Sequence, residues 1–206
     1  MPLSGTALTS FLVATSFAAG LNAYATVAAL GLLARAGMLA LPPSLAILQA
    51  WPVIAAAVAL FALEFVVDKI PFFDLVWNTL QTFVRVPVAA VLAFRATSHL
   101  PLESQLLSAL LGGAIALAAH TGKTAVRAAV TPSPEPFSNI GLSLGEDAAA
   151  VWLTWLAAHH PYLAAAIALG TVAVIVLFLR AAAQALGAWI GRRREEAARQ
   201  TPPPSP

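Results

Sequence analysis

A glutamate stands near the end of a long apolar stretch, WPVIAAAVALFALEFVVDKIPFFD, which runs from residue 51 to residue 74. A carboxylate inside bilayer hydrocarbon costs about 3 kcal/mol or more, so Glu64 is a candidate functional residue by default. Asp68 follows four residues later, and a helix would place both carboxylates on one face. Lys69 and Pro71 then end the stretch. Two acids at this spacing could bind a cation or carry a proton.

A second group of ionisable residues follows further along the chain. His120, Lys123 and Arg127 are spaced i, i+3 and i+7, so a helix would present them on one face. Glu146 and Asp147 form an adjacent acidic pair after a proline-rich loop. Helix ends at matching depths would bring these residues close to the acids of the first group.

Two interpretations of these charges are open. In the structural interpretation they pair near the headgroups and tie helix ends together, which suffices for Asp68, Lys69 and Arg127. Glu64 and His120 lie one to two turns deeper, and both side chains can change protonation state with their surroundings. A buried Glu–His or Glu–Lys pair is typical of a proton relay or a cation site. The candidate ion, proton or substrate site comprises Glu64, Asp68, Lys69, His120, Lys123, Asn22, Glu146 and Asp147.

Asn22 belongs to this set because of its place in the first apolar region, Ala7 to Ala34. That region is long for one span and is interrupted by Gly20-Leu21-Asn22. The simpler interpretation is one tilted helix that tolerates a glycine. The alternative is two half-helices around an unwound site, which some transporters use to direct backbone groups at a substrate. In either case the Asn22 amide needs a partner at that depth.

The composition identifies a membrane protein. Of 206 residues, 60% are hydrophobic and 10% are charged, against about 25% charged in globular domains. The mean hydropathy is +0.83, which excludes an ordinary soluble domain. The chain has no cysteine, so disulfides and thiolate metal sites are excluded. No nucleophile elbow, phosphate-binding loop or dinucleotide motif occurs, so we expect neither an enzyme nor a cofactor.

The predicted fold is all-α: a polytopic transmembrane helical bundle of about six spans. The spans are expected at 7–34, 46–69, 81–97, 105–127, about 143–159 and about 162–181, with a short interfacial element at 72–80. Arg85 and Pro87 are expected to open the third span. A capping box, Ser143 with Glu146, is expected to open the fifth, and Pro161 to permit a tight turn into the sixth. Residues 1–190 would form the transmembrane domain and residues 191–206 a basic, then proline-rich tail.

The basic residues predict an orientation. With six spans both termini lie on one side, and placing that side in the cytoplasm leaves only Arg35 and Arg95 outside. This agrees with the positive-inside rule and predicts a multi-pass protein of the inner (plasma) membrane. Three spans before Pro101 and three after it suggest two inverted three-helix repeats.

Four motifs give the chain a resemblance to a known family. They are GLNAY at 20–24, EFVVDKIP at 64–71, HTGK at 120–123 and SLGED at 143–147. In this order they resemble a bacterial integral-membrane family known only as a domain of unknown function, DUF forty-one twenty-six. The E-x-x-x-D-K-x-P block is the most specific of them. The resemblance covers the chain to about residue 180 and implies the fold and membrane placement, but no substrate.

A more distant likeness is to small cation exporters with an E-x-G-D-[KR]-[ST] motif in each inverted half. Here the block from Glu64 to Lys69 has one residue more, and Ile70 replaces the hydroxyl residue. The likeness is therefore an analogy that transfers no metal ligands, and a metal is left open.

Three functions are compatible with the sequence. The first is a small transporter or permease for a cation, a proton-coupled solute or another small solute. It would be a homo-oligomer in the lipid bilayer without a nucleic-acid partner. The second is a non-transporting membrane scaffold or partner-binding subunit. The third is an enzyme acting on lipid headgroups with His120 as general base, although no nucleophile accompanies it and no catalytic residue is assigned.

Overall fold

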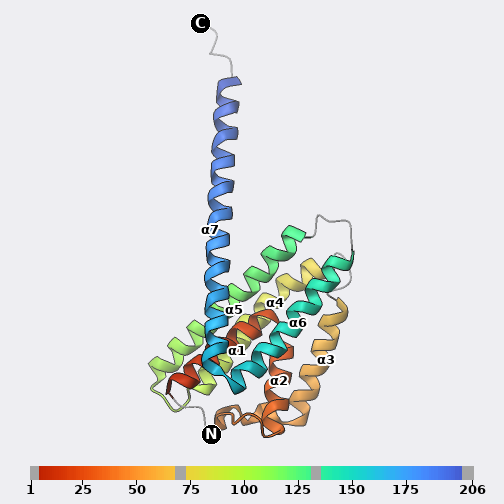
Figure 1. Ribbon diagram of the computed structural model, residues 1–206, viewed down its shortest axis with the longest axis vertical. Coiled ribbons are helices and arrows are strands. Elements are labelled where there is room, and N and C mark those ends of the chain that lie inside the picture. The colour runs from red at the N-terminus through yellow and green to blue at the C-terminus, as the bar shows by residue number, and fades with distance from the viewer. Residues whose placement is uncertain (1–4, 68–72, 131–135, 201–206) are drawn as a thin grey trace. The chain divides into compact units, whose positions relative to one another are not determined.

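The protein is described by a computed structural model that covers residues 5–67, 73–130 and 136–200. Within these ranges the chain forms only helices, as the sequence predicts. The elements are α1 Gly5–Leu21, α2 Ala23–Arg35, the 3-10 helix η1 Pro43–Gln49, α3 Trp51–Val67, α4 Phe73–Ala96, α5 Leu102–Val130, α6 Pro136–His159 and α7 Pro161–Gln200 (Figure 1). The chain divides into two units, Met1–Val172 and Ala173–Pro206, and α7 runs from the first into the second.

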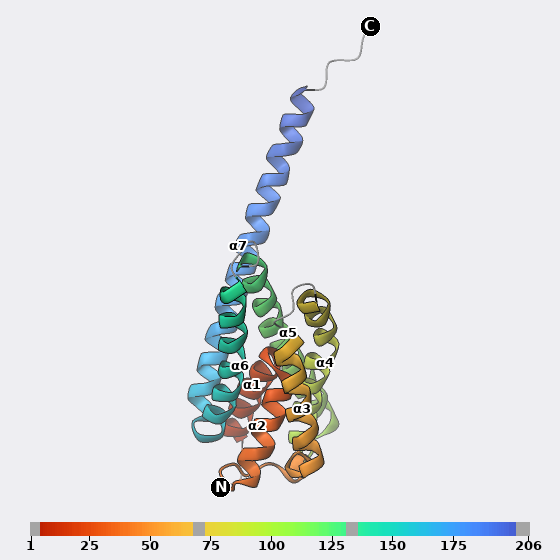
Figure 2. The same cartoon turned by 90° about the vertical axis from the view of Figure 1, so that its right-hand side faces the viewer.

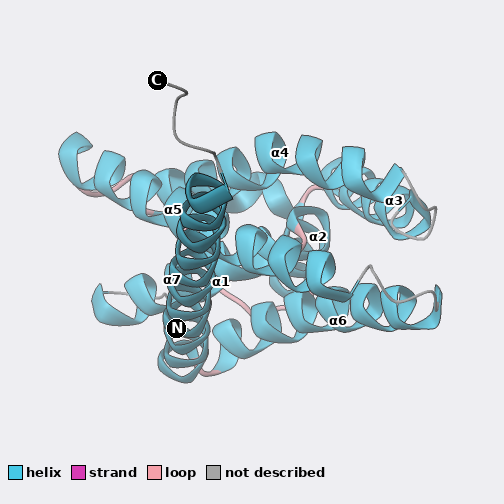
Figure 3. Ribbon diagram, turned by 90° about the horizontal axis from the view of Figure 1, so that it is seen from above, coloured by secondary structure: helices cyan, strands magenta, loops and turns pink. Residues whose placement is uncertain are grey.

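In the first unit, α1 and α2 occupy the interior. Seen from above, α4 and α5 lie on one side and α6 on the other, with α1 and α2 between them (Figure 3). Small residues allow this close packing: Ala19, Ala89 and Ala116 from α1, α4 and α5 meet with no exposed surface. Dispersion contacts between close backbones, rather than hydrophobic segregation, hold helices together in lipid.

The helices α1 and α2 form a hairpin whose two open ends lie at the same end of the unit (Figures 1 and 2). The first residues of α1 share a cavity wall with Thr97, just beyond α4. At the last residue of α2, Arg35 Nη1 donates to the Gln49 carbonyl at 3.0 Å. Ser44 of η1 in turn donates to the carbonyl of Arg95, in the last turn of α4. Both arms of the hairpin therefore reach the end of the unit where α4 ends.

The hairpin tip, where the two arms meet, consists of Gly20 and Leu21 at the end of α1 and of Asn22, which lies between the two helices. Asn22 has an extended backbone, with φ −151° and ψ 106°, and its Oδ1 accepts a hydrogen bond from the Ala25 amide at 2.9 Å. Asparagine is among the strongest N-caps because its side chain satisfies an amide at the first turn. Asn22 thus begins α2 where α1 has just ended. Of the two interpretations of the first apolar region, the two half-helices are confirmed.

The hairpin tip lies about halfway along the neighbouring helices. Arg85 contacts the Gly20 carbonyl and precedes Arg95 by ten residues, or about 15 Å of helix. The 24 residues of α4 extend about 36 Å, against about 30 Å for bilayer hydrocarbon. Polar groups at the tip are therefore far from both ends of α4.

Fewer spans are found than the sequence predicts. By length and composition, three described helices could cross a membrane: Trp77–Ala96, Leu102–Arg127 and Pro161–Arg193. A fourth is added if η1 and α3, which are bent by 63°, count as one broken span. The arms α1 and α2 have 17 and 13 residues and fall among the shorter apolar helices. The two inverted repeats stay a prediction.

The predicted second and third spans differ from the helices that form. Residues 46–69 do not form one helix, because the chain bends between η1 and α3 just before Pro52. The element predicted at 72–80 and the span predicted at 81–97 do not form separately: residues 73–96 are one helix, α4, with Pro87 inside it, and residue 72 lies outside the described residues. No helix breaker stands between residues 73 and 85, so the helix begins earlier than Arg85. That residue lies mid-helix rather than at a membrane boundary.

The last two helices also differ from prediction at some ends. The capping box is wrong: α6 begins at Pro136, a residue favoured in the first turn of a helix. Ser143 is therefore a buried position inside α6. The end of α6 at His159 and the turn at Pro161 are as predicted. The final helix continues beyond residue 181 to Gln200.

Candidate functional site

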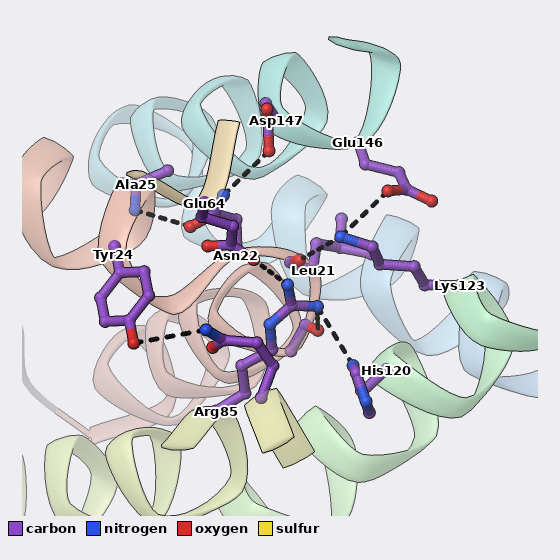
Figure 4. Close-up of polar contacts among 12 residues, drawn as sticks. Leu21, Asn22, Tyr24, Ala25, Glu64, Arg85, His120, Lys123, Glu146 and Asp147 are labelled. Carbon is purple, nitrogen blue, oxygen red and sulfur yellow. Dashed lines mark hydrogen bonds and ion pairs between the residues drawn. The ribbon is translucent and has the colours of Figure 1, made fainter. Parts of the chain in front are cut away.

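Arg85 is the centre of a buried polar cluster beside the hairpin tip (Figure 4). It comes from α4 and has 0% exposed surface. Its Nη2 forms an ion pair with Oε1 of Glu64, which α3 contributes and which is also 0% exposed. Its Nη1 donates to Nδ1 of His120 at 3.1 Å and to the Gly20 carbonyl at 3.4 Å. One guanidinium thus joins four helices, α1, α3, α4 and α5.

A second ionic group lies between α5 and α6. Lys123 Nζ is 3.0 Å from Glu146 Oε2, and Arg127 Nη2 is 2.8 Å from the same oxygen. Lys123 also donates to the Leu21 carbonyl at 3.3 Å. The Lys123 side chain has no exposed surface and that of Arg127 has 8%. Lys123 therefore connects this group to the hairpin tip.

Asn22 connects the hairpin tip to Asp147, the residue that follows Glu146 on α6. Its Nδ2 donates to Asp147 Oδ1 at 2.8 Å, while its Oδ1 caps α2. Asn22 is fully buried and Asp147 is 6% exposed. The partner that the sequence requires for a buried amide at this depth is therefore Asp147.

The charges match the helix dipoles that meet at the tip. The C-terminus of α1 carries a partial negative charge, because its last carbonyls have no acceptor role within the helix. Two of these carbonyls, of Gly20 and Leu21, accept from Arg85 and Lys123. The N-terminus of α2 carries a partial positive charge, and Asp147 lies there through Asn22. Cations and an anion thus occupy the favourable ends of the two half-helices.

The Tyr24 hydroxyl, at the start of α2, and the Gln81 amide, on α4, lie beside this cluster. Gln81, one turn before Arg85 on α4, donates from Nε2 to the Tyr24 hydroxyl at 3.4 Å. Tyr24 also lines a cavity of about 390 Å³ between α2, α3 and α4. The cavity wall is otherwise apolar and includes Leu60 and Val88. These two residues are about one turn from Glu64 and Arg85, respectively.

The structure brings together six of the eight residues that the sequence selects. These are Asn22, Glu64, His120, Lys123, Glu146 and Asp147, and with Arg85 and Arg127 they make up what we call the tip cluster. Asp68 and Lys69 lie outside the described residues. Among the described residues no group of three or more His, Asp or Glu side chains is arranged to hold a metal ion.

Arg85 is the functional candidate that sequence reasoning placed wrongly. A signal was present: Arg85 is the only charged residue between Asp74 and Arg95. An arginine isolated in the middle of about 20 uncharged residues fits an intramembrane charge better than a span boundary. The nearby Pro87 suggested a helix start instead, and α4 accommodates that proline internally.

The Glu64–Arg85 pair has a large effect on stability only when it is broken. Replacing a buried ion pair by apolar residues of similar volume is often neutral or stabilising. Removing one partner costs about 3–5 kcal/mol, because the other charge stays buried without compensation. Neither side chain can therefore lose its charge alone unless another group compensates.

Comparison with known proteins gives a family and nothing closer. No curated protein and no solved structure has a significant match to this chain. The model of one family, described as Domain of unknown function (DUF4126), matches residues 10–181. The matched segment includes the hairpin tip and every residue of the tip cluster. The chain belongs to this family of domains of unknown function.

Proposed function

We propose that the protein is a small permease in which Glu64 takes up and releases a proton as a solute or ion crosses the membrane. The observation that supports this is the Glu64–Arg85–His120 arrangement at the tip of a broken helix pair, halfway along α4. Broken helices in transporters place their ends at the substrate site in the same way. The proposal assigns no catalytic chemistry to the cluster.

The hairpin changes the proposed topology. Both ends of the hairpin lie at the end of the unit that carries Arg35 and Arg95, whereas Lys123 and Arg127 lie toward the other end of α5. The positive-inside rule supports a cytoplasmic location for the end with Lys123 and Arg127. The N-terminus is then non-cytoplasmic, in place of the cytoplasmic position that a first full span would give. A plasma-membrane location and a homo-oligomer remain part of the proposal.

The test is proton movement in proteoliposomes that contain a trapped pH-sensitive dye. Gradients of sodium, potassium or lactate are imposed in turn on wild-type protein, and at least one should drive proton flux well above that of empty vesicles. Glu64→Gln should reduce the flux to that of empty vesicles, because its amide cannot carry the proton. Glu103→Gln is the matched control, since Glu103 is exposed at the start of α5. Wild-type flux from folded Glu64→Gln would contradict the proposal.

The second candidate is a scaffold in which the charges only hold helices together. It is favoured by the close pairing of Glu64 with Arg85 and of Glu146 with Lys123 and Arg127. A scaffold needs no proton exchange, so every gradient should leave wild-type vesicles like empty ones. It should also copurify with a stoichiometric partner, whereas a permease should purify as copies of itself.

A further inference from the structure

We infer that Arg85 binds a small organic monocarboxylate, which is carried together with the proton that neutralises Glu64. This inference rests on the proposed function and adds the substrate class. It starts from Arg85, whose charge cannot change. Arginine stays protonated at every physiological pH, so a buried guanidinium always needs an anion.

Glu64 supplies that anion in the present structure. When Glu64 takes up a proton, Arg85 keeps its charge but loses its counter-ion. Among the described residues, the groups around the pair cannot replace it. On α5, His120 accepts from Arg85 and Lys123 is itself a cation; on α6, Glu146 is engaged by Lys123 and Arg127, and Asp147 by Asn22. On α2, the Tyr24 hydroxyl accepts a hydrogen bond from Gln81, and Asp68 lies outside the described residues.

Charge balance then selects the ligand. Among the described side chains of the tip cluster, the acids Glu64, Glu146 and Asp147 balance the bases Arg85, Lys123 and Arg127. A proton on Glu64 leaves one excess positive charge, which one monovalent anion restores to zero. A metal cation at Glu64 would instead add its charge beside Arg85 and Lys123. Uptake of one proton by Glu64 together with one monovalent anion at Arg85 therefore keeps the buried cluster neutral.

The geometry of the guanidinium favours a carboxylate among the monovalent anions. The Nε of Arg85 has no hydrogen-bond partner among the described residues, and Nη2, on the same edge of the guanidinium, is bonded to Glu64. Once the Glu64 bond weakens, Nε and Nη2 form a fork that fits the two oxygens of a planar carboxylate. A spherical ion such as chloride has no pair of acceptor atoms to match the two parallel N–H bonds.

A cavity whose wall includes Leu60 and Val88, one turn from Glu64 and Arg85 respectively, gives the reason why the carboxylate would be organic. Its volume of about 390 Å³ would accommodate a short chain, and among the described residues of its wall Tyr24 alone carries a hydroxyl. Leu60 precedes Glu64 by one turn of α3, and Val88 follows Arg85 by one turn of α4. Both cavity residues therefore lie on the same helix faces as the ion pair. A ligand with a carboxylate at Arg85 and a short apolar tail beside Leu60 and Val88 would complement both the charge of the guanidinium and the apolar cavity wall. The occupant that fits is therefore a small organic monocarboxylate.

The experiment is lactate binding to the purified full-length protein, measured by calorimetry at pH 5.5 and pH 7.5. Because one proton is bound with each carboxylate, wild-type affinity should fall by up to about tenfold per pH unit as the pH rises. Glu64→Gln imitates the protonated state, so it should bind lactate at pH 7.5 about as tightly as at pH 5.5. Glu64→Asp should keep the pH dependence, and Glu103→Gln should match wild type.

Arg85→Lys removes the fork but keeps the charge, and should weaken lactate binding at least tenfold. If that variant does not fold, the gain of binding by Glu64→Gln still decides the question. The inference is overturned if folded Glu64→Gln binds lactate no better than wild type at pH 7.5. It is also overturned if sodium or potassium, rather than lactate, binds and Glu64→Gln abolishes that binding.

These outcomes separate the inference from the proposed function. Proton flux driven by sodium or potassium but not by lactate would support a permease and refute the carboxylate. Lactate binding with the expected pH dependence, but no flux under any gradient, would support the carboxylate site and refute transport.

Discussion

Gly20→Ala tests the hairpin packing directly. A methyl group built on Gly20 would lie 2.4 Å from the Ala116 carbonyl oxygen and 2.7 Å from the Ala119 Cβ. The nearest of these atoms is backbone and cannot rotate away. Helices α1 and α5 must therefore separate by roughly 1 Å to reach ordinary contact distance, and the Gly20 carbonyl must shift relative to Arg85.

The expected cost follows from two opposing terms. Overpacking costs about 1–3 kcal/mol, while alanine in place of a helical glycine regains about 0.5–1 kcal/mol. The two ranges leave about 0–2.5 kcal/mol, and a clash with a backbone oxygen at 2.4 Å favours the upper part, a net destabilisation of about 1–2.5 kcal/mol. For a chain of this size, about 1 kcal/mol corresponds to 2–4 °C in Tm, so Gly20→Ala should lower the apparent Tm by about 2–10 °C.

Gly113→Ala is the matched control on the facing helix. A methyl group there would lie 3.5 Å from the nearest atom, Cγ1 of Val86, which is an ordinary contact. Its Tm should equal or exceed that of wild type. The assay is the apparent Tm in one detergent at one scan rate, since membrane proteins commonly unfold irreversibly. If Gly20→Ala is as stable as Gly113→Ala, the close approach of α1 and α5 is refuted.

Three further predictions concern the tip cluster and the topology. Glu64→Leu alone should lower the free energy of unfolding by about 3–5 kcal/mol. Adding Arg85→Met should restore at least half of the decrease in Tm, because the double variant leaves no uncompensated charge. A double variant without this recovery would contradict the buried pair. Lys123→Met should lower the Tm more than Arg127→Met, because Lys123 also donates to the Leu21 carbonyl at the hairpin tip. Equal losses would argue against that contact. Thr6→Cys in this cysteine-free chain should react with a membrane-impermeant maleimide added to intact cells, and labelling only after permeabilisation would place the N-terminus in the cytoplasm.

The polar residues of the site could be selected from the sequence because an ionisable group is conspicuous in an apolar chain. Glu64, His120 and Lys123 stand in stretches that otherwise read as membrane helix, and such residues face the protein interior or a polar cavity. Their depth relative to helix ends was enough to predict that they meet. Asn22 was found by its place at an interruption, without knowledge of its partner.

The hairpin could be suggested but not established from the sequence. The 28 mostly apolar residues from Ala7 to Ala34 suit one span as well as two half-helices, and no local pattern distinguishes them. What stabilises the turn is distant in the chain: Arg85 is 65 residues from Gly20, and Lys123 is 102 residues from Leu21. Hydrophobic periodicity gives little help, because faces toward lipid and faces toward the protein are both apolar.

The position of the charges bears on what the tip cluster is for. Holding this bundle together does not require charges, since Ala19, Ala89 and Ala116 already meet without exposed surface and Gly20 lies against Ala116. Burying a charge pair brings a desolvation cost that apolar residues of similar volume would not bring. The Glu64–Arg85 pair nevertheless lies halfway along α4, where that cost is greatest. The proposed role, in which Glu64 changes its charge, would account for this position better than a role in packing alone. The double replacement of Glu64 and Arg85 distinguishes the two: a stable protein without proton flux would assign the pair to transport.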